Sequence, residues 1–212
     1  MIEPLPPAAI FIVGARLVPF FKGRLKSAYL LIVPAFTFLD LLCMPPGQYW
    51  LVRFLDYDLI FGRVDKLSMA FGYIFVLITF IGTLYALNVK DDAQHMAGLL
   101  YAGGALGVTF AGDLFSLYVF WELLAIASVF LILARREQSS SAAALRYLMW
   151  HFFGGLCLLA GIVLYVTQRG TAEFGLIGLS DWASILIFTG FCLNAAVFPL
   201  HAWLPDAYPR AT

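Results

Sequence analysis

Glu122 is the residue whose position in the sequence points most directly to chemistry. It lies near the middle of Leu114–Leu133, a stretch of twenty residues that carries no other charge. Twenty helical residues rise about 30 Å, which is the thickness of the hydrocarbon core of a bilayer. An acid at that depth costs roughly 2.5–3.5 kcal/mol, and such acids usually mark ion or proton routes. We therefore interpret Glu122 as an ion-translocating residue; the alternative is an acid that only hydrogen-bonds a neighbouring helix.

Two further polar residues, Arg146 and His151, fall in the next apolar stretch. Arg146 lies near the start of that stretch, where a long basic side chain can snorkel to the membrane surface. Its alternative role is to be the positive partner of Glu122, and the sequence leaves both interpretations open. His151 is a candidate proton relay because imidazole titrates near neutral pH, although a packing hydrogen bond would also explain it.

The last apolar stretch, Trp182–Leu200, contains a polar residue between two helix breakers. Asn194 lies between Gly190 and Pro199. A proline inside a helix removes a backbone hydrogen bond, so we predict an interrupted helix here. Interrupted helices are tolerated at membrane depth where they line a cavity. We expect Asn194 to line a polar cavity shared with the two preceding helices, and His201 to be a gate, a relay or an interfacial residue.

Three other residues are assigned to capping or packing. Asp113 lies nine residues before Glu122, so the two side chains point to opposite faces of a helix and do not form a pair. We expect Asp113 to cap the N-terminus of the helix that begins at Leu114. Gly103 and Gly107 form a GxxxG pair, which allows a neighbouring helix to approach closely.

The composition is that of a helical membrane protein. Hydrophobic residues make up 62% of the 212 residues, charged residues only 12%, and the mean hydropathy is +0.89. Soluble domains average about 25% charged residues. The net charge is zero, so nothing favours nucleic acid as a partner. The three cysteines have no metal-ligand spacing, and no motif indicates a metal, a cofactor or a catalytic residue.

The apolar stretches predict an all-α transmembrane bundle of about seven spans, with the seventh discontinuous. The first span is short and is extended back to Pro4, and Ser141 is expected to cap the sixth. Residues 1–95 then hold three leading helices and an extracytoplasmic loop at 45–66, in which Tyr57–Val64 could form a short hairpin. Residues 96–212 hold the other four helices. The predicted spans are Ala8–Phe21, Ser27–Met44, Leu67–Leu87, Met96–Ala111, Leu114–Leu133, Ala142–Val166 and Trp182–Leu200.

The basic residues predict an orientation with the N-terminus outside the cytoplasm. Most of them then fall in cytoplasmic loops, as the positive-inside rule requires. The cytoplasmic group is Lys22, Arg24, Lys26, Lys90, Arg135, Arg136 and Arg210, and the opposite group is Arg53, Arg63, Lys66 and Arg169. We expect a multi-pass protein of the cell inner membrane.

Two motifs in this order resemble a known family. They are Phe120-Trp121-Glu122-Leu123 and the run FPLHAWLPDAYP at 198–209, and Val64–Ser68 also fits. The motifs resemble the antiporter-like subunits of respiratory complex I, of Mrp-type sodium/proton antiporters and of membrane-bound hydrogenases. The second run is most similar to the D-type member of the Mrp antiporters. The resemblance covers only the N-terminal half of such subunits, so it implies that 96–212 is an incomplete first repeat.

The resemblance also implies a site and a function. In the family the glutamate that matches Glu122 pairs with a lysine of the seventh helix, and here Asn194 best matches that lysine. Glu122 therefore either stays protonated or takes Arg146 as its partner. The first hypothesis is an ion-translocating subunit of a multisubunit cation/proton antiporter that moves protons and sodium.

Two other functions remain open. One is a proton-pumping membrane-arm subunit of an NADH:quinone oxidoreductase or a hydrogenase, with the redox chemistry in other subunits. The other is a structural subunit without transport of its own. In each case the expected partners are other membrane subunits, including a chain that supplies the remaining C-terminal helices; transport by this chain alone is not expected.

Overall fold

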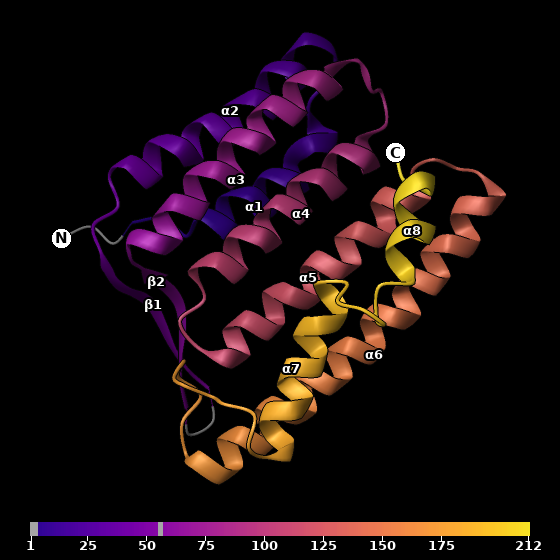
Figure 1. Ribbon diagram of the computed structural model, residues 1–212. Coiled ribbons are helices and arrows are strands. Elements are labelled where there is room, and N and C mark those ends of the chain that lie inside the picture. The colour runs from indigo at the N-terminus through magenta and orange to yellow at the C-terminus, as the bar shows by residue number, and fades with distance from the viewer. Residues whose placement is uncertain (1–3, 55–56) are drawn as a thin grey trace.

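Each long apolar stretch of the sequence forms a helix in the computed structural model, which describes residues 4–54 and 57–212 (Figure 1). Short 3₁₀ turns follow three of the helices, at Val18–Phe20, Ala86–Asn88 and Tyr208–Arg210. The helices are α1 (Pro7–Leu17), α2 (Gly23–Leu42), α3 (Lys66–Tyr85), α4 (Asp92–Phe110), α5 (Leu114–Leu133), α6 (Gln138–Arg169), α7 (Trp182–Asn194) and α8 (Trp203–Ala207).

Aspartate residues fix the starts of several helices. Asp65, Asp113 and Asp181 each accept hydrogen bonds from backbone N–H groups in the first turn of α3, α5 and α7. These N–H groups have no partner within the helix, and a carboxylate also suits the positive end of the helix dipole. The predicted capping role of Asp113 is therefore confirmed.

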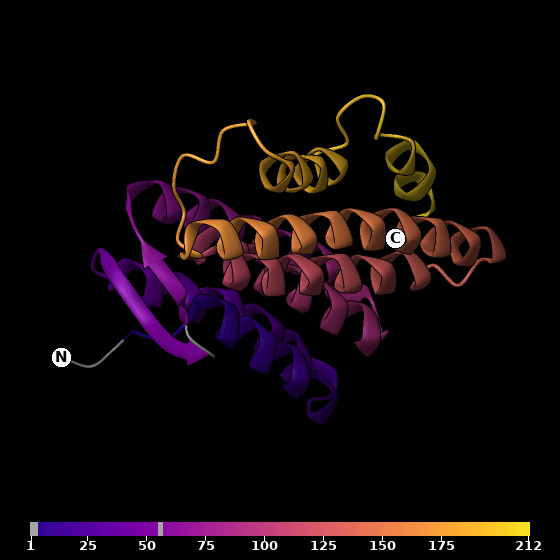
Figure 2. The same ribbon diagram turned by 90° about the horizontal axis from the view of Figure 1, so that it is seen from below.

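The helices form two groups joined along α4 and α5. In the first group α1 packs against α4, and α2 packs against α3. In the second, α5 packs against α6, while α7 and α8 both pack on α6. Figure 2 shows α7 and α8 as an outer layer on the far side of α6 from α1 and α4. The chain therefore places α6 between α5 and the interrupted α7–α8 segment.

Four helical segments of the described residues are long and apolar enough to cross a membrane: Gly23–Leu42, Lys66–Asn88, Leu114–Leu133 and Gln138–Arg169. The segments Pro7–Phe20 and Trp182–Asn194 are apolar but shorter. The α4 helix forms close to its predicted range but does not meet the same criterion. The protein is thus a mostly helical membrane protein, and four of the seven predicted spans coincide with helices that could cross a membrane by their length and composition.

Two local predictions need correction. Tyr57–Val64 does not form a hairpin by itself; it is strand β2, which pairs antiparallel with β1 (Gly47–Phe54). Ser141 does not cap α6, because this helix begins at Gln138 after Glu137. The serines are held inside the helix, where Ser140 Oγ donates to the carbonyl of Arg210 at 2.9 Å.

The GxxxG pair of α4 faces two different neighbours. A methyl group at Gly103 would lie 3.2 Å from the carbonyl oxygen of Ala8 on α1. A methyl group at Gly107 would collide with the ring of Phe120 on α5. Both glycines permit close packing as predicted, but they serve separate interfaces rather than one seam.

Candidate functional site

Glu122 lies at the interface between α5 and α6. Its carboxylate packs against Gly155, where a methyl group would lie 2.2 Å from Glu122 Oε1. The side chain is partly buried, so it faces protein as expected. Among the described residues, no side chain or backbone group forms an ion pair or hydrogen bond with this carboxylate. The Glu122 carboxylate thus packs directly against the backbone of α6 at Gly155, which has no side chain.

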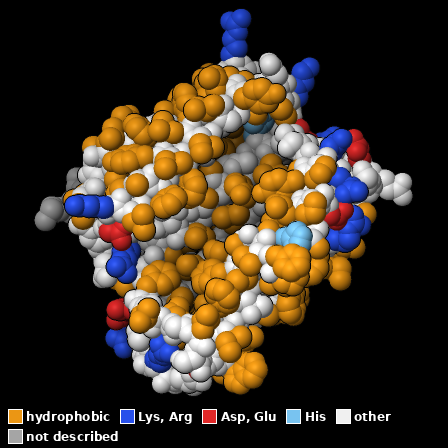
Figure 3. Space-filling view, viewed as in Figure 1, with side chains coloured by type: hydrophobic (Ala, Val, Ile, Leu, Met, Phe, Trp, Pro, Cys, Tyr) orange, Lys and Arg blue, Asp and Glu red, His pale blue; other side chains and the backbone are white. Residues whose placement is uncertain are grey.

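A central groove of about 1160 Å³ runs between the two helix groups. One wall is formed by α3 and α4, and the other by α5, α6 and α8; Figure 3 shows the hollow, which is lined largely by apolar side chains. The groove extends from Asp65, at the start of α3, to Gln94 and His95, at the start of α4. Its polar lining also includes Tyr101, Ser128, Tyr147, His151 and Asn194.

His151 is a buried polar residue of this groove. It is 5% exposed, and neither ring nitrogen has a hydrogen-bond partner within the described residues. The ring stacks on Tyr147 at 3.9 Å and meets the edge of Trp203 at 4.6 Å. Asn194 lies beside it and lines the same groove. A buried imidazole with two open nitrogens calls for water or a proton donor, because unpaired polar groups are costly in an apolar interior.

The predicted interruption of the seventh helix is present. Helix α7 ends at Asn194, and turns lead from there through Pro199, which follows a cis peptide bond, to α8. Trp203 Nε1 donates to the carbonyl of Leu193 at 2.9 Å and so satisfies one of the acceptors exposed by the interruption. Asn194 therefore lies at the open end of a helix and lines a cavity shared with α5 and α6, as predicted, but this cavity is lined largely by apolar side chains and also by α3 and α4, and was predicted to be polar.

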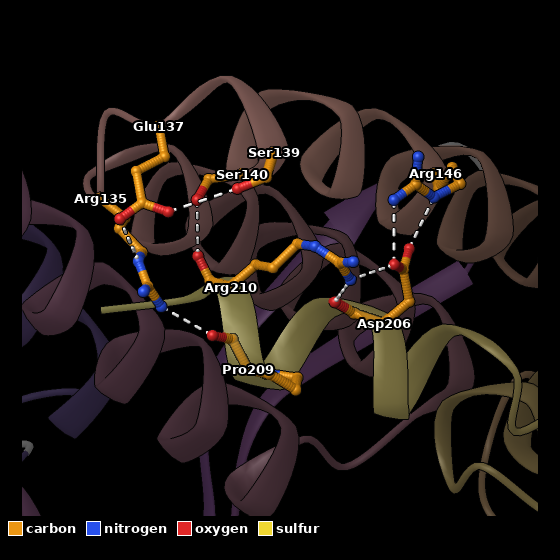
Figure 4. Close-up of polar contacts among 8 residues, drawn as sticks. All are labelled: Arg135, Glu137, Ser139, Ser140, Arg146, Asp206, Pro209 and Arg210. Carbon is orange, nitrogen blue, oxygen red and sulfur yellow. Dashed lines mark hydrogen bonds and ion pairs between the residues drawn. The ribbon is translucent and has the colours of Figure 1, made fainter.

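Arg146 does not pair with Glu122 and does not snorkel alone. Its Nε and Nη2 atoms donate to the two carboxylate oxygens of Asp206, at 2.6 and 2.9 Å. Arg210 bonds to the same carboxylate and donates to the Asp206 carbonyl at 2.7 Å (Figure 4). The hydrogen bonds from Arg146 lower the pKa of the Asp206 carboxyl below its usual range. The positive charge of Arg146, which the sequence offered as a partner for Glu122, therefore pairs with Asp206 and attaches α8 to α6.

His201 is not brought together with the other predicted residues. It is exposed in the turn before α8, with its ring 5.5 Å from that of Phe198. The structure therefore groups His151 with Asn194, places Glu122 against Gly155, one turn further along α6 from His151, and leaves His201 outside.

Several residues of the site were missed at the sequence level. Asp206 and Trp203 belong to the FPLHAWLPDAYP run, which was used only as a family signature. Tyr147 and His95 were not among the predicted site residues. Within residues 4–54 and 57–212, no three His, Cys, Asp or Glu side chains are grouped so that they could hold a metal ion.

Comparison with known proteins agrees with this architecture. Residues 111–212 match the family described as "NADH:quinone oxidoreductase/Mrp antiporter, TM". Subunit A1 of the Na⁺/H⁺ antiporter of Staphylococcus aureus is 32% identical over an alignment of 180 residues that covers 77% of this chain and 22% of that protein. The motif favoured the D type, whereas this relative is of the A1 type. The chain thus spans about a fifth of the length of this curated relative.

Solved structures share the fold. A chain of the Mrp complex of a Dietzia species superposes with a TM-score of 0.83 at 24% identity, covering 97% of this chain and 25% of that one. A chain of the archaeal membrane-bound sulfane sulfur reductase gives 0.80 at 24% identity, covering 97% and 47%. A chain of respiratory complex I from Thermus thermophilus gives 0.75 at 22% identity, covering 95% and 46%.

The family match covers α5, α6, α7 and α8, which are the helices that hold Glu122, His151 and Asn194. The chain therefore belongs to the family of antiporter-like membrane subunits shared by Mrp antiporters and complex I.

Proposed function

We propose that this chain is an ion-translocating subunit of a multisubunit cation/proton antiporter of the Mrp type. The observation that carries the proposal is the Glu122 carboxylate, held between α5 and α6 without a cationic partner in the described structure. An acid in this setting exchanges a proton with water or a relay more readily than one fixed in an ion pair. Protons and sodium are the proposed ions.

The relay is formed by the polar groups of the central groove. His151 offers two open ring nitrogens, and Asn194 offers an amide at the interrupted end of α7. Ser128 and Tyr147 add hydroxyl groups to the same groove. A water molecule needs two to four such partners to be held in a protein interior. We infer that water in this part of the groove connects the relay to Glu122.

The proposed topology has seven membrane crossings, α1 to α7, with the N-terminus outside the cytoplasm. Ion pairs support the predicted alternation of loops: Lys26 bonds Asp92 at 2.8 Å, and Arg136 bonds Asp91 at 2.6 Å. Both pairs lie at the end that the positive-inside rule assigns to the cytoplasm. In the assembled complex, a helix of a companion membrane segment covers the central groove, whose lining is too apolar for water along its full length.

Substitution of Glu122 tests the proposal. Glu122→Gln keeps the shape of the side chain but removes the proton-carrying group, so ion-coupled discharge of a pH gradient should be abolished while assembly is retained. The measurement uses vesicles that contain the chain together with the membrane proteins that co-purify with it in mild detergent. Full transport by a normally assembled Glu122→Gln complex would refute the proposal.

A second pair of variants tests the geometry. Gly155→Ala should impair transport, because its methyl group would displace the carboxylate. Glu122→Asp should partly restore transport in that background, since the shorter side chain withdraws from the methyl group. Gly98→Ala is the matched control, because open space surrounds this position on α4. Equal effects of the Gly155 and Gly98 substitutions would show that the contact with Glu122 is irrelevant.

One observation favours a structural role instead: Asn194 cannot supply the positive charge that the family resemblance expects. Asn194→Lys separates these functions, since a restored lysine should be tolerated or improve coupling only where Glu122 carries protons. The proteins that co-purify with the chain decide the driving reaction. Small antiporter subunits support the Mrp assignment, whereas flavin and iron–sulfur proteins would assign the chain to a redox-driven complex.

A further inference from the structure

Helix α8 is attached to α6 by ion pairs and hydrogen bonds at one end of the molecule. Asp206 receives both donors of Arg146 and is also bonded by Arg210. The following turn is held by Arg135 Nη1, which donates to the carbonyl of Pro209 at 2.7 Å. Figure 4 shows these side chains bridging the start of α6 and the segment 206–210. These polar contacts, together with the apolar packing of Trp203 and Ala207 against α6, keep this segment in place.

The same short helix carries the aromatic cover of His151. Trp203 lies three residues before Asp206, so the two side chains project from neighbouring parts of one turn. Its ring is 6% exposed and contacts both the His151 ring, at 4.6 Å, and the Tyr147 ring, at 5.4 Å. Moving α8 away from α6 would therefore remove a wall from around the unpartnered imidazole.

The connection between α7 and α8 is suited to such a movement. Its backbone is held by local hydrogen bonds, such as Val197 N to Cys192 O at 2.9 Å and Leu200 N to Val197 O at 2.6 Å. Phe198 in this connection is 82% exposed. The segment between Asn194 and Trp203 can therefore act as a hinge, while the ion pair at Asp206 sets the closed position.

We propose that Arg146 and Asp206 form a latch that holds Trp203 over His151, and that opening of this latch admits water from the adjacent end of the molecule to His151 and Asn194. Asp206 and Arg146 are then positioning residues rather than ion carriers. The relevance of the opening to transport rests on the proposed function, but the opening itself is measurable without transport.

The test measures access to position 151 with a small water-soluble methanethiosulfonate reagent. His151→Cys is placed in a chain whose native cysteines at 43, 157 and 192 are replaced by alanine, and the assembled complex in membranes is labelled. Asp206→Asn and Arg146→Gln should each raise the labelling rate about fivefold, the scale expected for loss of a partly exposed bidentate pair. The double variant should add little more, because both substitutions open the same latch.

Three further variants complete the test. Trp203→Ala should raise labelling at least as much as loss of the latch, and Asp206→Glu should largely restore protection. Asp181→Asn, which removes an ion pair with Arg169 at the other end of the molecule, should leave the rate unchanged. Unchanged labelling after Asp206→Asn and Arg146→Gln would overturn the latch, and unchanged labelling after Trp203→Ala would overturn the cover.

The same measurements in a Glu122→Gln background separate this inference from the proposed function. The latch predicts the same increase in labelling there, because access to position 151 does not require the carboxylate. If Glu122→Gln retains transport while the labelling changes persist, the proposed function fails and the latch stands. If transport is lost but labelling is insensitive to the latch, only this inference fails.

Discussion

Replacing Asp113 with alanine should destabilise the protein more than loss of an ordinary helix cap. The carboxylate is fully buried and accepts backbone hydrogen bonds from Phe115 and Ser116, both at 2.9 Å, within the first turn of α5. Its other oxygen accepts from the backbone of Ile60 in β2, at 2.6 Å, and from the Ser116 hydroxyl, at 2.5 Å. One side chain thus joins a helix start to the hairpin.

The magnitude follows from these bonds. Loss of the local cap costs about 1 kcal/mol. The Ile60 N–H and the Ser116 hydroxyl are then left buried without an acceptor, and each such group costs about 1–3 kcal/mol. The total for Asp113→Ala is about 3–7 kcal/mol. Asp181→Ala removes a similar cap from α7, but its side chain is 30% exposed and water can replace it, so a smaller loss of stability is expected.

Equilibrium unfolding in mixed detergent micelles with increasing sodium dodecyl sulfate, followed by circular dichroism, compares the two variants directly. Asp113→Asn should fall between wild type and Asp113→Ala, because the amide keeps one acceptor oxygen. If Asp113→Ala costs no more than Asp181→Ala, the bond to the hairpin contributes no net stability and the reasoning is wrong.

Two other predictions concern α7 and α8. Gly190→Ala should cost about 1–3 kcal/mol of stability by overpacking, because its methyl group would lie 2.9 Å from a backbone carbonyl of α6. Gly98→Ala should be neutral or slightly stabilising, since open space surrounds that position. Thermal unfolding of both variants checks this. The attachment of α8 should persist at pH 5 and weaken only below about pH 4. Arg146 and Arg210 face the Asp206 carboxyl and hold its pKa low, so the stabilisation is present above the unfolded pKa and is lost as the pH falls through the folded pKa. Hydrogen exchange of residues 203–210, corrected for intrinsic rates, would contradict this if protection fell already at pH 6.

Features determined by neighbouring residues could be predicted from the sequence. The bounds of α5, Leu114–Leu133, were predicted without error because a charged residue, Asp113, and an arginine pair delimit a wholly apolar run. The helix cap formed by Asp113 depends on the backbone N–H groups of Phe115 and Ser116, which are only two and three positions further along the chain. The end of α7 near Asn194 followed from Gly190 and Pro199 in the same way.

Features determined by distant residues could not be predicted. The partner of Arg146 lies 60 positions away, and the sequence offered only Glu122 or the membrane surface. Ser140 Oγ donates to a carbonyl 70 positions away, a contact that no local pattern indicates. Periodicity states which residues share a helix face, but it does not state which helix that face meets.

The contact between Glu122 and Gly155 also sets the depth of the latch in the membrane. If Glu122 lies at the bilayer midplane, Arg146, nine residues from Gly155 along α6, lies about 14 Å from it. Half of the hydrocarbon core is about 15 Å thick. At that depth the pair of Arg146 with Asp206 would sit at the boundary between acyl chains and headgroups. Hydrophobic mismatch acts directly on such a position. In a thin bilayer of short-chain lipids the ion pair would be exposed to water, whereas in a thick bilayer it would lie within the hydrocarbon core, where the attraction between the two charges is stronger. Bilayer thickness would in this way tune how readily water reaches the interior of the protein.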